Sequence, residues 1–243
     1  MKNIILAAGY ATRLYPLTEN FPKPLLKIGD NTILGRLLMD IDAVKGIDAH
    51  IIVTNHKFAD YFKKWSEQIE TDHPIYIVDD GSTSNDNRLG AVKDLLLAIE
   101  TKHINDDILV AAADNVLDFP LQGFVDFFNT KNASCIMCYN EQSRKNLQRT
   151  GVIAVNDNWK VLEMQEKPEE PLSHWAVPPF YIYSKTDLTI IRTAMQHGCG
   201  FDAPGNLAHY LVDKTDVYAW HMFGKRFDIG SLDSYEEAKY IFI

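Results

Sequence analysis

The sequence has no run of about 18 apolar residues, so it predicts no transmembrane helix. The N-terminus also lacks the charged and then apolar order of a signal peptide, because the apolar run Ile4 to Ala8 leads directly into Gly9 and Arg13. Cysteine is scarce, and an odd set of three residues is typical of a reducing compartment. We therefore expect a cytoplasmic protein with no membrane partner.

Positive charge is scarce as well. The 24 Lys and Arg residues against 33 Asp and Glu residues leave a formal net charge of −9. This charge argues against binding to nucleic acid or to an anionic membrane, since both attract basic patches. The sequence also has no G-x-x-x-x-G-K-(S/T) motif and no G-x-G-x-x-G after its first apolar run, which excludes P-loop kinases and Rossmann dehydrogenases.

The pair Cys135 and Cys138 has the C-x-x-C spacing of some metal and redox sites. It lies within residues 133–139, whose composition predicts a β-strand. Side chains three positions apart point to opposite faces of a strand. We therefore do not expect this pair to bind a metal or to carry out redox chemistry.

What the sequence does contain is enough apolar residues for one large α/β domain, 46% of a length of 243. In the first half, short apolar runs typical of buried strands alternate with segments of helical periodicity. The expected strands are 3–8, 50–54, 75–78 and 108–113, and the expected helices are about 30–44, 57–69 and 89–100, the first capped by Asp30 or Asn31. Such repeats predict a mostly parallel twisted sheet with helices on both faces.

The second half is richer in strands. We expect strands at 133–139, 151–155, 161–165, 176–183 and 217–221, and helices at about 121–130, 186–196, 206–212 and 233–240. No internal repeat or linker separates the two halves. We therefore expect a single domain, 1–243, in which the second half is a β-rich extension of the same core.

A turn rich in small residues follows the first apolar run. Small side chains leave backbone N–H groups open, and Gly9 can adopt backbone angles forbidden to other residues and lets a ligand approach the main chain. Arg13 and Lys23, ten positions apart, supply a planar fork and a point charge suited to phosphoryl oxygens. The stretch therefore predicts a binding site for a polyphosphate.

Residues 6–25 resemble the signature of the sugar-phosphate nucleotidyltransferases, in the short, glucose-1-phosphate thymidylyltransferase-like form. The signature reads roughly L-A-(A/G)-G-x-(G/A)-T-R-L-x-P-x-T-x-x-x-P-K-(P/Q)-L, and the chain matches it nearly throughout. The resemblance implies a Rossmann-like nucleotidyltransferase fold, with a nucleotide-binding half at about 1–130 and an acceptor-binding half at about 131–243. It also implies that Arg13 and Lys23 are catalytic and that the nucleotide is bound by Leu6, Ala7, Ala8 and Gly9.

The chain departs from its relatives at two places. Ala11 stands where many of them have a second glycine, and we infer that the loop does not need a glycine-only conformation there. The polar loop 79–87 replaces the Pro- and Gly-rich segment that faces the nucleobase in better-known members. Gly90 is expected near the base, and the identity of the base stays open.

Two acidic residues match further motifs of the family. Asp114 follows the strand 108–113, at the carboxyl end of the predicted sheet, where ligands bind in such folds. Asp228 lies in the sequence F-D-I-G-S at 227–231, which resembles a late family motif that precedes a helix containing E-A, here at 237–238. Because carboxylate oxygens are ligands of Mg²⁺, we expect Asp114 and Asp228 to hold a Mg²⁺ cofactor.

The tripeptide Glu166-Lys167-Pro168 resembles the E-K-P element that binds the acceptor in this family. It follows a strand after Gly151-Val152-Ile153. The resemblance implies that Lys167 meets the phosphate of the acceptor, that Glu166 binds the sugar and that Gly151 also lies at the acceptor.

The expected reaction is attack by an acceptor phosphate oxygen on the α-phosphorus of a nucleoside triphosphate, in line with departing pyrophosphate. The leading acceptor is a sugar-1-phosphate, which gives a nucleotide-sugar for products such as cell-surface polysaccharide. A phosphocholine cytidylyltransferase-like enzyme and a non-catalytic nucleotide-binding regulatory subunit are the alternatives. The oligomeric state stays open, a homo-oligomer included.

Overall fold

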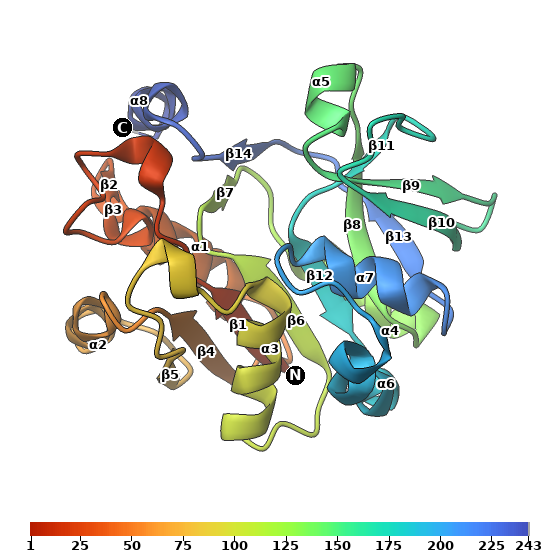
Figure 1. The fold of residues 1–243 in the computed structure, drawn as a ribbon, viewed down its shortest axis with the longest axis horizontal. Coiled ribbons are helices and arrows are strands. Elements are labelled where there is room, and N and C mark those ends of the chain that lie inside the picture. The colour runs from red at the N-terminus through yellow and green to blue at the C-terminus, as the bar shows by residue number, and fades with distance from the viewer. Residues whose placement is uncertain (243) are drawn as a thin grey trace. The chain divides into compact units, whose positions relative to one another are not determined.

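The computed structural model describes residues 1–242 and divides the chain into two compact units (Figure 1). The first unit contains Met1–Leu89, Ala112–Leu121 and Gly224–Ile243, and the second unit contains Gly90–Ala111 and Gln122–Phe223. Both units combine helices with a β-sheet, as the sequence predicts. The expectation of a single domain with halves that meet near residue 130 stays a prediction, and the two units alternate along the chain.

The first unit is built on three parallel strands. Strand β4 (Ala49–Thr54) pairs in parallel with β1 (Lys2–Leu6) on one side and with β5 (Ile75–Asp79) on the other. All six residues of β4 are buried, which is why this strand reads as a continuous apolar run. The helices α1 (Ile33–Asp42) and α2 (Ala59–Ser66) connect these strands. The predicted parallel arrangement is confirmed for these strands.

The start of helix α1 differs from the prediction by one or two residues. Its N-cap is Thr32, whose hydroxyl oxygen accepts a hydrogen bond from the backbone N–H of Gly35 at 2.9 Å. Asp30 and Asn31 are also good capping residues in the sequence. Asn31, however, pairs with Ile28 in the short hairpin of β2 (Lys27–Ile28) and β3 (Asn31–Thr32), so the helix begins after it.

A second short pairing joins distant parts of the first unit. Strand β7 (Asn115–Leu117) runs antiparallel to β14 (Arg226–Asp228), and Asn115 stands opposite Asp228 in the register. Residues 115–117 are not among the strands that the sequence predicts. Three residues are too few to show a strand periodicity, and this pairing exists only because the two segments meet in the fold.

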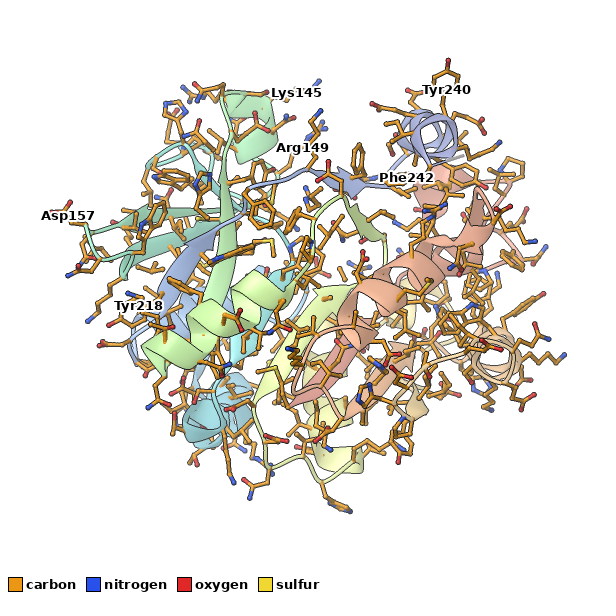
Figure 2. All side chains as sticks on the ribbon, turned by 180° about the vertical axis from the view of Figure 1, so that it is seen from behind. Lys145, Arg149, Asp157, Tyr218, Tyr240 and Phe242 are labelled. Carbon is orange, nitrogen blue, oxygen red and sulfur yellow. The ribbon has the colours of Figure 1, made fainter. Side chains whose placement is uncertain are left out.

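Helix α8 (Leu232–Ile241) closes the first unit. Ser231 caps it by accepting a hydrogen bond from the backbone N–H of Ser234, and its inner face packs into an apolar cluster. The buried members of this cluster are Leu14, Ile28, Ile33, Val116, Ile229, Tyr235 and Ala238. Tyr240 lies on the outer side and is 81% exposed, while Phe242 packs against the cluster (Figure 2). The closing helix therefore buries the segment around Leu14.

The second unit has a mostly antiparallel sheet. Its strand order is β10-β9-β11-β8-β12-β6, and β13 pairs in parallel with β8 (Figure 1). The strands are β6 (Ile108–Ala112), β8 (Cys135–Asn140), β9 (Gly151–Val155), β10 (Val161–Glu166), β11 (Trp175–Val177), β12 (Phe180–Tyr183) and β13 (Tyr218–His221). The expected strand 176–183 is broken between β11 and β12, because Pro178 and Pro179 cannot donate to a ladder. This sheet is the β-rich extension that the sequence predicts.

The helices of the second unit lie close to their predicted positions. They are α3 (Ala91–Thr101), α4 (Gln122–Lys131), α5 (Arg144–Leu147), α6 (Leu188–Thr193) and α7 (Gly205–Val212). The expected helix 186–196 consists of α6 between two 3-10 turns, and α5 was not predicted because it has a single turn. Within residues 1–242 we find no helix with the length and apolar character that a bilayer crossing requires.

Cys135 and Cys138 lie on strand β8, as predicted. Both side chains are fully buried, and all three cysteines of the chain are free thiols. Burial raises the pKa of each of the two thiols in β8 to about 12. They are therefore protonated core residues at neutral pH, because only a thiolate is an effective nucleophile or metal ligand.

Candidate active site

The loop after β1 is anchored by its neighbouring strand β4. The backbone N–H of Ala7 donates to the carbonyl of Val53 at 2.8 Å, and the side-chain amide of Asn55 donates to the carbonyl of Ala8 at 3.0 Å. Ala7 and Ala8 are buried, while Gly9 is exposed. The chain therefore turns to the surface at Gly9. Asn55 was missed in the sequence, although a polar residue directly after an apolar strand was a signal for it.

The backbone of this loop has its unusual conformation at Ala11 and not at Gly9. Gly9 does not adopt a left-handed conformation, and a Cβ atom placed on it would meet no atom within 4 Å among the described residues. Ala11 does adopt one, with φ 47° and ψ 42°, at the position where many relatives have glycine. The hydroxyl of Thr18 donates to the carbonyl of Ala11 at 2.8 Å and holds this conformation in place. The strained residue is therefore Ala11, not Gly9.

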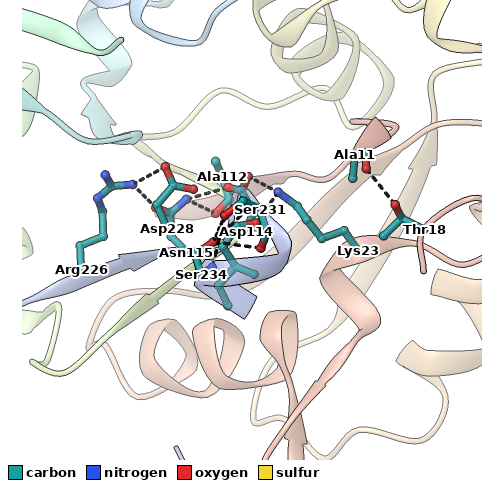
Figure 3. Close-up of polar contacts among 11 residues, drawn as sticks. Ala11, Thr18, Lys23, Ala112, Asp114, Asn115, Arg226, Asp228, Ser231 and Ser234 are labelled. Atoms are coloured by element: carbon teal, nitrogen blue, oxygen red, sulfur yellow. Dashed lines mark hydrogen bonds and ion pairs between the residues drawn. The ribbon is translucent and has the colours of Figure 1, made fainter. Parts of the chain in front are cut away.

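The two predicted cations sit on short 3-10 turns. Arg13 lies in η1 (Thr12–Leu14) and is exposed, and within residues 1–242 no hydrogen bond or ion pair holds its guanidinium. Lys23 begins η2 (Lys23–Leu25), and its side chain is 12% exposed. The Lys23 ammonium donates to Asp114 Oδ2 at 2.6 Å and to the carbonyl of Ile229 at 2.9 Å (Figure 3). An ammonium has three donors, so one remains for a phosphate oxygen.

Asp114 lies beside the loop that follows β1, which the sequence predicts to bind phosphate and which we call the phosphate loop. The backbone N–H of the preceding residue, Ala113, donates to the carbonyl of Leu6 at 3.0 Å. Asp114 Oδ1 accepts from the side-chain amide of Asn115 at 2.8 Å, and Asp114 Oδ2 accepts from Lys23. Burial by itself would raise the pKa of Asp114, but the nearby charge and hydrogen bond of Lys23 outweigh it, and the pKa is lowered. Asp114 is thus a carboxylate at neutral pH.

Asp228 is the second carboxylate of this cluster. Its Oδ2 lies 3.6 Å from Arg226 Nη1, and the same nitrogen donates to Asn115 Oδ1 at 2.6 Å (Figure 3). The pKa of Asp228 is raised, chiefly by burial and then by the negative charge of Asp114. Arg226 was missed in the sequence. The signal was its spacing, because residues two apart on a strand share a face, and Arg226 and Asp228 lie on β14.

The two carboxylates fit a divalent cation. Asp114 and Asp228 are close enough that the charge of one raises the pKa of the other, and the side chain of Asp228 is 54% exposed. A hard cation such as Mg²⁺ binds carboxylate oxygens and would remove this repulsion. The first unit therefore brings together Lys23, Asp114 and Asp228, as the sequence predicts, and adds Asn115 and Arg226, whereas Arg13 stays apart from this cluster.

The polar loop after β5 is ordered by its own side chains. The hydroxyls of Tyr10 and Ser82 lie 3.1 Å apart, and the Ser82 hydroxyl also bonds Asp80 at 3.0 Å. A capping box of Ser84 and Asn87 holds the 3-10 turn η3 (Asn85–Asn87). Tyr10 thereby links the phosphate loop to the segment that we expect to face the nucleobase.

Gly90 has a packing role in the second unit. It takes a φ of 95°, and a Cβ atom there would lie 2.6 Å from the carbonyl oxygen of Phe201. The backbone N–H of Ala91 donates to the backbone carbonyl of Asp202 at 3.2 Å, and that of Val92 donates to the backbone carbonyl of Phe201 at 3.0 Å. Glycine is required at position 90 for this close approach. Its expected contact with the nucleotide stays a prediction.

The acceptor residues predicted from E-K-P lie in the second unit. The Glu166 carboxylate lies against two glycines: a Cβ on Gly205 would overlap its Oε2, and a Cβ on Gly151 would lie 3.2 Å from it. Burial raises the pKa of Glu166, and the charge of Lys167 opposes this shift. Glu166 also lines a pocket of about 370 Å³ together with Gly198, Cys199, Gly200, Asn206, His209, Tyr210 and Asp213. Gly151 and Glu166 are thus brought together.

Lys167 has an unusual backbone for a residue other than glycine. Its φ is 50°, and its N–H donates to the carbonyl of Thr150 at 3.1 Å. The side chain is exposed. A left-handed conformation at a lysine costs about 1–2 kcal/mol, and such strain is concentrated at functional sites. This conformation directs the chain away from β10 directly after Glu166.

Comparison with known proteins decides the family. The sequence model described as "Nucleotidyl transferase" matches residues 2–242. The chain belongs to this family. The resemblance found in residues 6–25 is thereby confirmed, and the protein is an enzyme of the nucleotidyltransferase class.

Two curated relatives show how much of the chain is shared. The UTP–glucose-1-phosphate uridylyltransferase AglF of Haloferax volcanii is 26% identical over 98% of this chain and 95% of its own length. The bifunctional protein GlmU of Methanococcus aeolicus is 33% identical over 94% of this chain and 53% of its own length. The chain therefore spans nearly all of the first relative and about half of the second.

Solved structures share the fold. A UDP-glucose pyrophosphorylase in complex with UDP-glucose matches with a TM-score of 0.83 at 22% identity, over 99% of this chain and 97% of that chain. A putative glucose-1-phosphate thymidylyltransferase from Bacillus anthracis matches with a TM-score of 0.81 at 22% identity, over 99% and 94% of the two chains. These similarities confirm the α/β fold of the nucleotidyltransferases.

Proposed function

We propose that this enzyme couples a nucleoside triphosphate to a sugar-1-phosphate and releases a nucleotide-sugar and pyrophosphate. The observation that carries the proposal is the cluster of Lys23, Asp114 and Asp228 next to the loop that follows β1. Such a cluster combines a positioned cation with a divalent-metal site beside open backbone N–H groups. Polyphosphate chemistry needs all three features.

The reaction is a substitution at the α-phosphorus. An oxygen of the acceptor phosphate forms the new P–O bond, and the bond from the α-phosphorus to the bridging oxygen of pyrophosphate breaks. The acceptor phosphate already carries negative charge at neutral pH, so no side chain has to remove a proton. Catalysis then rests on positioning and charge stabilisation, in which Lys23 meets the α-phosphate and Arg13 the departing phosphates.

Asp114 and Asp228 are the proposed ligands of Mg²⁺. The bound ion would neutralise charge on the phosphate oxygens. Asn115 and Arg226 keep the two carboxylates in place through their hydrogen bonds and ion pair. These residues would therefore orient the proposed metal ligands.

Glu166, Lys167 and Gly151 are the proposed acceptor residues. One relative is a UTP–glucose-1-phosphate uridylyltransferase and one similar structure holds UDP-glucose, which supports a sugar-1-phosphate as the acceptor. One observation favours phosphocholine as a second candidate: the pocket at Glu166 also presents Asp213 and Tyr210. Carboxylates and aromatic rings suit a quaternary amine.

The setting of the reaction is proposed to be the cytoplasm. The three cysteines are all unpaired and buried, which supports a reducing compartment. A nucleotide-sugar made there would serve as an activated donor for polysaccharide synthesis.

The decisive experiment is a matrix of five nucleoside triphosphates against a panel of sugar-1-phosphates and phosphocholine, read by pyrophosphate release with Mg²⁺. We expect one sugar-1-phosphate to give the highest rate with one nucleotide. If phosphocholine gave the highest rate of pyrophosphate release, the acceptor would be phosphocholine and not a sugar-1-phosphate. No release above background with any pair would leave a regulatory nucleotide-binding role in place of the proposed one.

A further inference from the structure

The first unit contains a second cluster of metal-ligating side chains, made of Asp42, His50 and His73. Asp42 ends helix α1, His50 is the second residue of β4, and His73 precedes β5. One atom from each of the three side chains lies within 4.8 Å of the others. The cluster is at the start of the parallel strands, whereas the phosphate loop follows the end of β1. It therefore takes no part in the proposed reaction.

The carboxylate of Asp42 is held in a fixed orientation. Its Oδ2 accepts from the backbone N–H of Asp72 at 2.7 Å. Its Oδ1 lies 2.8 Å from His50 Nε2 and 2.7 Å from His73 Nδ1. Two imidazole nitrogens from distant segments thus converge on one oxygen. Three side-chain atoms that can each bind a metal are therefore gathered at one place, and hydrogen bonds hold them together in the absence of an ion.

The other ring nitrogen of His50, Nδ1, has a neighbour that can serve both the metal-free and the metal-bound protein. Its Nδ1 lies 2.9 Å from the side-chain amide nitrogen of Asn3, and Asn3 is fully buried. The amide oxygen of Asn3 has no hydrogen-bond partner within residues 1–242. A half-turn of this amide presents the oxygen to His50 Nδ1 and allows that nitrogen to carry the proton. His50 Nε2 then has a free lone pair for a cation.

We propose that Asp42, His50 and His73 form a site for one divalent transition-metal cation, with Zn²⁺ as the best match. Two imidazoles and one carboxylate are the donor set of Zn²⁺ and related ions, while Mg²⁺ and Ca²⁺ prefer oxygen ligands alone. The fourth position is left to water. This ion would be distinct from the Mg²⁺ proposed at Asp114 and Asp228.

The present spacing is close to what Zn²⁺ needs. Ligand atoms at about 2.1 Å from a tetrahedral ion lie about 3.4 Å from each other, so the two nitrogens must move outward by roughly half an ångström. The His50 side chain is fully buried on β4 and gives little. The His73 side chain is 27% exposed and lies in the segment before β5, so it can move outward and supplies the entry path, while the shift away from His50 has to come from the Asp42 carboxylate, which is 12% exposed.

The bound ion would join three segments of the first unit. Helix α1, strand β4 and the segment before β5 each contribute one ligand, and without an ion these three side chains are held to one another by hydrogen bonds, of which the one from the partly exposed His73 is open to water. A ligand that binds only the folded chain stabilises it in proportion to its concentration and affinity. We therefore assign the site a structural role.

The test measures Zn²⁺ uptake by untagged protein that has been stripped with chelator, in excess Mg²⁺ so that oxygen sites are filled. Calorimetry and metal analysis should show one Zn²⁺ per chain with a dissociation constant below about 10 µM. His73→Ala should weaken this uptake by at least about 100-fold, because loss of a mere hydrogen-bonding partner of a ligand already costs about 10–100-fold. Co²⁺ should give the visible absorption of a tetrahedral site in the wild type and not in His73→Ala.

Two further variants sharpen the result. Asp42→Asn keeps the shape and the bond from Asp72 but removes the charge, and it should also abolish uptake. His56→Ala is the matched control, since His56 is an exposed histidine paired with Asp79 elsewhere in the unit, and it should bind like the wild type. The proposal is overturned if the wild type takes up no such equivalent, or if His73→Ala binds within about 10-fold of it.

Discussion

Lys23 joins segments of the first unit that are far apart in the sequence. Its ammonium bonds Asp114, 91 positions away, and the carbonyl of Ile229, 206 positions away. This pair of bonds fixes a positive charge beside the phosphate loop and lowers the pKa of Asp114. At the scale of single residues, the proposed roles of Lys23 are therefore two: it would contact the substrate, and it keeps Asp114, the proposed metal ligand, ionised.

Substituting Lys23→Ala should reduce pyrophosphate release by about 10²–10³-fold, because one preorganised charge-stabilising group is lost. The measurement is the rate of release at saturating Mg²⁺ and nucleotide. Lys27→Ala is the matched control, as Lys27 is an exposed lysine of the same segment, and it should retain the wild-type rate. Equal rates in both variants would contradict the role of Lys23.

Ala11 offers a test by stability. Its left-handed backbone costs a non-glycine residue about 1–2 kcal/mol, and glycine removes this cost. Glycine also has more conformational freedom in the unfolded chain, which offsets about half of that stabilisation. Ala11→Gly should therefore raise the free energy of unfolding in urea by about 0.5–1 kcal/mol. Ala8→Gly, a buried residue of the same loop without a positive φ, should lower it. A decrease with Ala11→Gly would show that the loop conformation differs from the one described.

Asp228 should show a conflict between function and stability. Its pKa in the folded protein is raised by partial desolvation and by the charge of Asp114, so the ionised form is less favourable in the folded state than in the unfolded state, by an amount that solvent reduces because the side chain is 54% exposed. The contribution to stability is present at low pH and is lost as the pH rises through the folded pKa. Asp228→Asn should thus raise the Tm of metal-free protein at about pH 7.5 by roughly 1–2 °C, with no gain at about pH 3.

The same variant should lose Mg²⁺-dependent turnover by about 10²-fold or more. Asp157→Asn is the control, since Asp157 is an exposed acid in the turn before β10 (Figure 2), and it should change neither Tm nor turnover. A lower Tm for metal-free Asp228→Asn would contradict the described charge repulsion.

At the scale of elements, the start of helix α7 decides where Glu166 lies. Gly205 is the first residue of α7, and the carboxylate of Glu166 occupies the space that a Cβ at that position would need. Helix α7 therefore depends on glycine there because a side chain from β10 approaches it. The short pair β7 and β14 plays the same part in the first unit, since it sets Asp228 opposite Asn115.

Gly205→Ala should push the Glu166 carboxylate away from its place. If Glu166 binds the acceptor, the KM for the acceptor should rise by about 10-fold or more, while the KM for the nucleotide stays the same. Steady-state kinetics with each substrate varied in turn provides the measurement. Glu166→Gln is the reference for loss of the acceptor contact, and an unchanged acceptor KM in Gly205→Ala would contradict the role of this carboxylate.

At the scale of the whole molecule, the net charge of the chain and the local charge of the proposed phosphate site have opposite signs. The chain carries a net charge of −9, yet Arg13 and Lys23, the two cations proposed to bind phosphate, lie within a stretch of fewer than 20 residues. An overall negative protein does not attract nucleic acid, and a local pair of cations still binds a small polyphosphate. The sequence order of strands and helices predicted the α/β class because periodicity is a local property of each segment.

The sequence by itself determined the family, the phosphate loop and the residues that the motifs name, because these are written within short stretches of chain. Only the tertiary structure decided that Lys23 pairs with Asp114, that Asn115 contacts Asp114 and Arg226 contacts Asp228, and that Ala11 has a left-handed backbone. It also brought His50 and His73 to the same carboxylate oxygen of Asp42. Such contacts depend on how distant segments meet, and no local pattern encodes that.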